Sequence, residues 1–136
     1  MRGGVDQDRS LPARLKWAVF LLSGVFLLLA GLCLVAPASA AGFYGLEADA
    51  PSALFYVRAI GLRDAALALY LLGLATAGVR RGLTIVALAT LIIPAGDMLL
   101  LAASGAGGPV HYLLHAASLL CFAGLAWWSS RATPAG

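Results

Sequence analysis

Charged residues are scarce in this sequence. Only 11% of its 136 residues are Asp, Glu, Lys or Arg, whereas 62% are hydrophobic; soluble domains average about a quarter charged and about half apolar. A chain of this length forms one domain, and a domain this small buries only about 60 to 70% of its unfolded surface, which is too little to hide so many apolar side chains. The composition excludes an ordinary soluble domain and indicates that the lipid bilayer is the solvent.

Cysteine is also scarce, and cations are not gathered into a patch. The two cysteines, Cys33 and Cys121, both lie inside apolar runs, where a small apolar side chain packs and a disulfide framework does not form. No basic patch is interleaved with exposed aromatic residues, so we expect no nucleic-acid partner. No cofactor is expected either.

Long apolar runs make up most of the chain. Each is close to the roughly 20 residues that a helix needs to cross about 30 Å of hydrocarbon, and only helices satisfy the backbone of such runs in lipid. Short connections join the later runs, so neighbouring helices should be antiparallel. The sequence predicts an all-α integral membrane protein, an up-down four-helix bundle within residues 14–131, with a polar tail at 1–13, a short tail at 132–136, and spans at 17–36, 53–79, 83–103 and 110–128.

The positions of the cations predict the orientation in the membrane. Seven of the nine Lys and Arg residues precede the first run, separate the second from the third, or follow the fourth: Arg2, Arg9, Arg14, Lys16, Arg80, Arg81 and Arg131. Because cations accumulate in cytoplasmic connections, we expect a multi-pass protein of the cell membrane with both termini in the cytoplasm. Trp17, Trp127 and Trp128 would lie at that same membrane face, where aromatic rings prefer the headgroup level.

The first run has an alternative interpretation as a secretory signal. Arg14 and Lys16 precede it, and the stretch "ASA" at 38–40 fits a signal peptidase site. A signal peptide has an apolar core of roughly 7 to 15 residues, and this run is about twenty residues long. We therefore expect a retained helix.

Four charged residues interrupt the second and third spans. At about 1.5 Å per residue, Arg63 and Asp64 lie about 15 to 17 Å from the outer end of their helix, and Arg58 about 8 Å. Asp97 lies about 9 Å from the outer end of the next helix. Each such charge costs about 2.5 to 3.5 kcal/mol at the bilayer centre, and the four sum to zero, so mutual pairing is expected.

A specific pairing follows from helix geometry. Adjacent residues of a helix point about 100° apart, so we predict no simple local pair between Arg63 and Asp64. We predict instead that Arg63 pairs with Asp97 on the neighbouring helix. Two tyrosines at seven-residue spacing lie on the same stripe as Arg63 and are expected to hydrogen-bond the pair: Tyr56 and Tyr70.

Two further features belong to the same outer half. Pro94, three residues before Asp97, removes a backbone donor and predicts a functional kink beside a cavity, or alternatively a kink tolerated only for packing. The outer connection at 37–52 is the longest and carries Phe43 and Tyr44 between glycines. This aromatic pair predicts an interfacial anchor, or alternatively a cap or gate at the outer end of the bundle.

Two histidines lie in the outer turns of the fourth span. His111 and His115 are four residues apart and therefore share one face. With Asp97 they have the residue types of a two-histidine, one-carboxylate metal site, but the spacing is equally that of two hydrogen-bonded side chains, and no metal is predicted. His115, the deeper of the two, is the better candidate proton donor or acceptor, because imidazole changes charge near neutral pH.

These residues carry a resemblance to a known family. The strings "YVRAIGLRD" at 56–64 and "PAGD" at 94–97, with the Gly-Phe-Tyr-Gly connection, make the chain similar to the small four-helix membrane proteins catalogued as domain of unknown function four-two-six-seven. The residues that carry the match are Gly61, Arg63, Asp64, Asp97 and His115. The resemblance covers roughly all four helices and implies an architecture without an activity. A looser resemblance to DoxX-like four-helix membrane proteins implies the same fold and no chemistry.

The sharpest functional hypothesis is a cavity in the outer half of the bundle that binds a small lipophilic molecule. In this hypothesis Asp64, Asp97 and His115 are catalytic, in acid-base chemistry of the isomerase or cyclase type, and Arg63 holds an anionic or carbonyl oxygen. The ligand-binding candidates are Tyr56, Arg58, Arg63, Tyr70 and His111.

Two alternatives come from other classes of protein. The first is a structural or accessory membrane protein whose Arg-Asp pairs only fix helix packing. The second is a small proton-coupled transporter that works as a homo-oligomer, since Gly24, Gly31 and Gly73 could let helices of neighbouring protomers approach closely. In every case the expected surroundings are the lipid bilayer.

Overall fold

The chain folds into helices joined by short connections. The computed structural model describes residues 11–46, 48, 50–105 and 107–131, and this part of the chain contains no β-strand. The helices are α1 (Ala13–Val35), α2 (Pro37–Phe43), α3 (Pro51–Thr76), α4 (Arg80–Thr90), α5 (Ile92–Ser104) and α6 (Pro109–Arg131). The predicted all-α fold class is confirmed.

Four stretches of helix are long and apolar enough to cross a membrane. They are α1, α3, the consecutive pair α4 and α5, and α6, with mean hydropathies between 1.4 and 2.7. Large apolar side chains such as Leu21, Leu28, Leu69 and Leu120 point outward and are exposed, as expected for surfaces that contact lipid. The chain is therefore a membrane protein with four spans, while the side on which its termini lie stays a prediction.

The third span is divided into two helices. α4 ends at Thr90 and α5 begins at Ile92, with Leu91 in a turn between them. Pro94 has no N–H for the carbonyl of Thr90, four residues earlier, so the helical hydrogen-bond ladder is interrupted at this point. The kink expected from Pro94 is present, and the proline itself is buried.

The connection between the first two spans is more structured than the sequence suggested. Residues 37–43 form α2, which starts with Pro37 in its first turn, where the missing N–H is not needed. α2 packs against the adjoining ends of α1 and α3 in a small core of Cys33, Ala40, Ala41, Ala48 and Val57. A short run of small residues has no helical periodicity, and for that reason α2 was not predicted.

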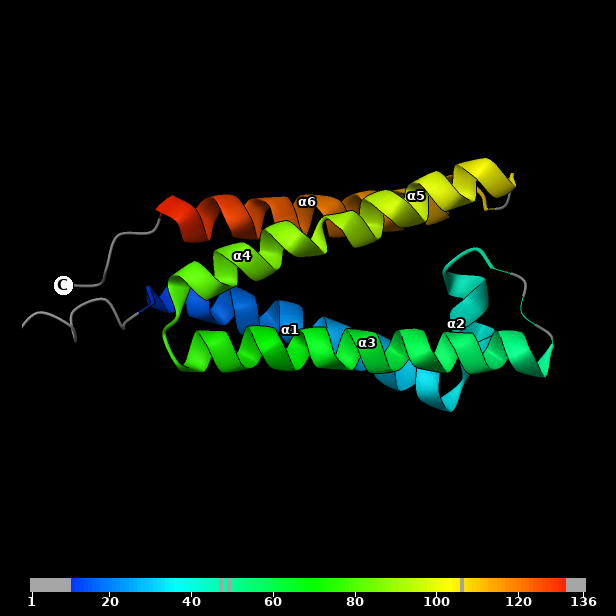
Figure 1. Cartoon of the computed structure of the whole chain (residues 1–136), viewed down its shortest axis with the longest axis horizontal. Coiled ribbons are helices and arrows are strands. Elements are labelled where there is room, and N and C mark those ends of the chain that lie inside the picture. Colours follow the sequence, from blue (N-terminus) through cyan, green and yellow to red (C-terminus); the bar gives the residue numbers. More distant parts are fainter. Residues whose placement is uncertain (1–10, 47, 49, 106, 132–136) are drawn as a thin grey trace, which may run out of the picture.

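The spans are arranged as two halves, which we call the α1–α3 half (α1, α2 and α3) and the α4–α6 half (α4, α5 and α6). α1 lies beside α3, and α4 and α5 lie beside α6 (Figure 1). Near the end where α1 begins and α6 ends, the halves share one core, whose fully buried members include Leu15, Leu71, Leu83 and Phe122.

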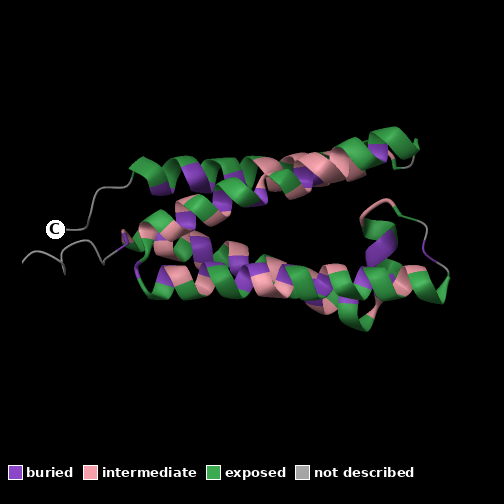
Figure 2. Cartoon of the chain, in the orientation of Figure 1, coloured by how far each residue is buried: buried purple, intermediate pink, exposed green. Residues whose placement is uncertain are grey.

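Toward the opposite end the halves diverge, and α2 lies between them (Figure 1). The outward faces of both halves are exposed along their length, and buried residues line their inner faces (Figure 2). The divergence leaves room for a cavity on the α2 side of the bundle.

Candidate functional site

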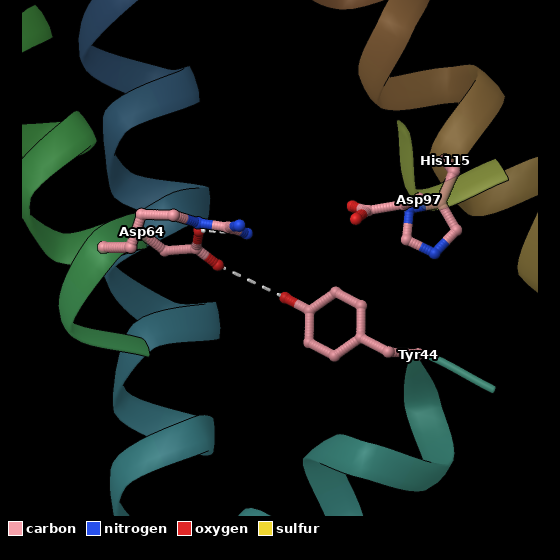
Figure 3. Close-up of polar contacts among 5 residues, drawn as sticks. Tyr44, Asp64, Asp97 and His115 are labelled. Atoms are coloured by element: carbon pink, nitrogen blue, oxygen red, sulfur yellow. Dashed lines mark hydrogen bonds and ion pairs between the residues drawn. The ribbon is translucent and has the colours of Figure 1, made fainter. Parts of the chain in front are cut away.

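Titratable side chains from both halves face one another at the diverging end. Tyr44, at the end of α2, and Asp64, on α3, lie opposite Asp97 and His115, from α5 and α6 (Figure 3). Asp64 and His115 are among the few buried polar residues of the described part, at 4% and 6% exposure.

The polar group of the α1–α3 half is centred on Asp64. Arg63 Nη2 donates to Asp64 Oδ1 at 3.4 Å, and Tyr44 Oη donates to Asp64 Oδ2 at 3.5 Å (Figure 3). The prediction that Arg63 and Asp64 form no local pair was wrong. Their Cβ atoms do point apart, but the arginine side chain is long enough for its guanidinium to return to the neighbouring carboxylate.

The polar group of the α4–α6 half consists of Asp97 and His115. His115 Nδ1 lies 3.4 Å from Asp97 Oδ2, so this contact joins α5 to α6. The predicted pair of Arg63 with Asp97 was also wrong, because each of these residues has a nearer partner within its own half. The two groups meet where the ring of His115 lies 6.1 Å from the ring of Tyr44, centroid to centroid, with the planes at 30°.

A cavity of about 340 Å³ lies between the two groups. Its wall is largely apolar and is formed by residues of α3, α5 and α6 and of the segment after α2: Tyr44, Leu46, Ile60, Arg63, Asp97, Leu100, Leu101, Ser104 and His115. The structure therefore brings three of the sequence-selected residues, Arg63, Asp97 and His115, to one cavity, and Asp64 lies behind Arg63 and Tyr44.

Tyr44 is a polar cavity residue that the sequence did not single out as part of a site. Burial, and next the nearby Asp64 carboxylate, raise the pKa of the Tyr44 phenol, which keeps its O–H protonated and able to donate a hydrogen bond. Its position between two glycines after a helix was the available signal, but it was interpreted as an interfacial anchor, cap or gate.

Three of the candidate ligand-binding residues lie away from the cavity. Tyr56 and Tyr70 are 70% and 64% exposed, and Arg58 is also exposed on α3. The expected hydrogen bonds from Tyr56 and Tyr70 to the Arg63–Asp97 pair are not formed. The seven-residue stripe faces outward, and the Arg63 side chain bends out of it toward Asp64.

His111 has a structural position at the end of the bundle. Its Nδ1 accepts a hydrogen bond from the Gly108 N–H at 2.8 Å. Its ring lies against Gly45, where an added Cβ would be 2.8 Å from His111 Cγ and where φ is +79°, so only glycine fits. His111 thus connects the turn before α6 to the segment after α2.

These contacts do not support the alternative of a metal site made by two histidines and one carboxylate. His111 Nδ1 is occupied by a backbone donor, and the part of the chain that the structure describes contains no group of three His, Cys, Asp or Glu residues close enough to hold an ion.

The fold and the clustered charges define a class, the small multi-pass membrane proteins with ionisable residues inside their spans. The family model described as Domain of unknown function (DUF4267) matches residues 23–129, more than half of the chain. The chain belongs to this family, which confirms the resemblance carried by the Gly61-to-Asp64 element. The looser DoxX-like resemblance stays a prediction. No curated protein and no solved structure matches the chain.

Proposed function

We propose that the protein binds a small lipophilic molecule in the cavity between its two halves, with an oxygen-bearing group of the ligand held by the charged side chains. The observation that carries this proposal is that Arg63 on one wall and the Asp97–His115 pair on the other line the same largely apolar cavity. Small-molecule sites commonly combine an apolar wall with a few converging polar groups. Ionisable residues inside a membrane span are functional by default, because each is costly to insert.

The positions of the ion pairs argue against one structural role, that of holding the two halves of the bundle together. A lock between the halves requires a charge pair that crosses from one half to the other. In the described residues the Arg63–Asp64 contact stays within α3, and the Asp97–His115 contact joins α5 to α6. Neither pair ties the halves together, although both line or adjoin the space between them.

The arrangement supports acid-base chemistry of the isomerase or cyclase type. A proton on Nδ1, which lies 3.4 Å from Asp97 Oδ2, would leave a free lone pair on His115 Nε2, and the carboxylate would favour that tautomer as in other Asp–His pairs. His115 would remove a proton from a carbon next to a carbonyl and return one to another carbon. Arg63 would stabilise the negative charge that develops on the carbonyl oxygen between these steps.

Asp64 has a supporting role in this proposal. It accepts hydrogen bonds from both Arg63 and Tyr44, and so it fixes the two donors that face the cavity from the α1–α3 half. Tyr44 would hold the ligand ring or chain in place next to His115. The role is one of positioning, whereas Asp97 and His115 are the catalytic candidates.

The test is native mass spectrometry of the full chain released from lipid nanodiscs, which detects small molecules retained by the protein. We expect a bound lipophilic molecule in the wild type, and at least about tenfold lower occupancy in Arg63→Gln and Asp97→Asn, since each removes a charged partner of the ligand. Arg58→Gln is the matched control, because it removes the same charge from the same helix outside the cavity and should retain the ligand.

Two results would contradict the proposal. Equal ligand occupancy in all four proteins would show that the cavity charges do not hold the molecule. Unfolding of Arg63→Gln and Asp97→Asn, with recovery of the fold in an Arg63→Met, Asp97→Leu double variant, would support the structural alternative. Proton uptake by proteoliposomes upon addition of the identified molecule would favour the transporter.

A further inference from the structure

α3 and α5 both contribute to the wall of the cavity without packing closely against each other. Ile60 from α3 and Leu100 from α5 line the cavity, and Leu100 is 69% exposed. The charged side chains of these two helices are partly accessible as well, with Arg63 at 47% and Asp97 at 34%. Both helices belong to membrane spans, so an opening between them would face the bilayer.

Other residues line the remaining sides of the cavity. Buried His115 lies on the α6 side, and Tyr44 and Leu46, the latter 43% exposed, lie on the side of α2. Figure 1 shows α3 and α5 at the front of the molecule, with α1 and α6 behind them and α2 across the diverging end. Leu100 is more exposed than Leu46, so the side of α3 and α5 offers a route from the lipid.

The volume of the cavity limits what can lie inside it. The volume is about 340 Å³. This is near the lower end of the range for small-molecule sites. A compact head group fits, whereas the two chains and large head group of a phospholipid do not.

We infer that the ligand is a single-chain amphiphile dissolved in the membrane. Its compact, oxygen-bearing head lies between Arg63 and the Asp97–His115 pair, and its chain leaves the cavity between Ile60 and Leu100. This inference rests on the proposed function and specifies the ligand class and its route. Because lipid tails are as apolar as leucine side chains, the chain gains little affinity in the opening, and the head provides the specificity.

A photolabelling experiment tests the lateral route between α3 and α5 separately from binding in the cavity. The probe is para-dodecylphenol with a diazirine on the third carbon of its chain, added to the full-length protein in nanodiscs, and the competitor is para-ethylphenol, which has the head without the long chain. We expect labels on lipid-facing residues beside the opening, such as Leu62, and a several-fold decrease when para-ethylphenol is in excess.

Different outcomes of this experiment would contradict the lateral route and the cavity as the binding site. Displaceable labels confined to α6 or to residues 44–46 would overturn the lateral route and leave the cavity as the binding site. Labels that para-ethylphenol does not displace, and that Asp97→Asn does not reduce, would overturn the cavity site and the route together.

A pair of neighbouring tryptophan variants provides the second measurement. Leu100→Trp narrows the opening, whereas Leu99→Trp adds the same bulk one residue away, at a position that is 71% exposed and does not line the cavity. We expect Leu100→Trp to lower labelling by para-dodecylphenol about tenfold while para-ethylphenol still binds, as measured by saturation-transfer NMR. Equal labelling of the two variants would show that the chain does not pass Leu100.

Discussion

The close approach of α1 to α3 at Gly61 predicts a measurable loss of stability in Gly61→Ala. A Cβ at this position would lie 2.7 Å from the Cys33 Cβ and 2.9 Å from the Ala30 carbonyl oxygen. Non-bonded carbon atoms pack at about 3.5 to 4.0 Å, so the two helices must separate by several tenths of an ångström or more. The Ala30 contact is to backbone, which cannot turn aside as a flexible side chain can.

The magnitude follows from two opposing effects. Overpacking of a well-packed contact costs about 1 to 3 kcal/mol, while alanine in place of glycine inside a helix contributes about 0.5 to 1 kcal/mol of stability. We expect a net loss of about 1 to 2 kcal/mol for Gly61→Ala. Gly73→Ala, in the same helix, is the matched control, because its added Cβ meets no atom within 4 Å, and it should gain up to about 1 kcal/mol.

The assay is reversible unfolding in mixed micelles of increasing SDS fraction, followed by far-ultraviolet circular dichroism. Gly61→Ala should unfold at a lower SDS fraction than the wild type, and Gly73→Ala at an equal or higher one. If Gly61→Ala is as stable as Gly73→Ala, then α1 and α3 do not approach as described. A separation of these helices would also shift Asp64, one turn beyond Gly61, so Gly61→Ala should lower ligand occupancy as well.

Three further predictions concern polar groups within the helices, each measured by the same unfolding assay. Ser23 Oγ is buried without a hydrogen-bond partner, so Ser23→Ala should raise the free energy of unfolding by about 1 kcal/mol; a loss of stability would reveal a partner. Thr84 Oγ1 and Ser129 Oγ lie 2.8 Å apart between α4 and α6, and a double-mutant cycle of Thr84→Val and Ser129→Ala should give a coupling energy of about 0.6 kcal/mol; zero coupling would contradict the contact. His111→Ala removes the acceptor of the Gly108 N–H, so it should cost about 1 to 2 kcal/mol and speed amide hydrogen exchange at Gly108; unchanged exchange would exclude the bond.

The sequence was sufficient for the spans because the bilayer imposes a length and a composition on them. Each of the four apolar runs corresponds to a helical span, and Pro94 was sufficient to predict the break in the third. α2 was not predicted because residues 37–43 are only seven in number, are mostly small, and show no helical periodicity of apolar side chains. Nothing in such a stretch distinguishes a buried helix from a loop on the membrane surface.

The pairing of the charges was predicted less well, for a geometric reason. Counting residues along a helix gives the depth of Arg63, Asp97 and His115, and these residues do line one cavity. It does not give the rotation of each helix about its axis, which packing determines. In α3 that rotation is set by Gly61 against α1, which turns Asp64 inward and leaves Arg63 half exposed. Tyr44 follows a short helix, and no periodicity connects its position to the spans.

The distribution of contacts between the halves bears on how the cavity could admit a ligand. At the end near the termini the halves share a continuous apolar core. At the diverging end, the contacts described between them are the approach of the Tyr44 ring to the His115 ring and the packing of Gly45 against His111. The ion pairs each stay within one half.

Widening this end would therefore break the Tyr44–His115 and Gly45–His111 contacts and leave both ion pairs intact. Regions with few buried contacts open at the lowest cost in free energy. A protein whose charges held the two halves together would show the opposite arrangement, with Arg63 bound to Asp97 across the gap. The charges instead stay paired within each half, so they would keep their places if α3 and α5 moved apart. This combination suits a site that takes molecules from the bilayer and keeps its polar groups preorganised while it does so.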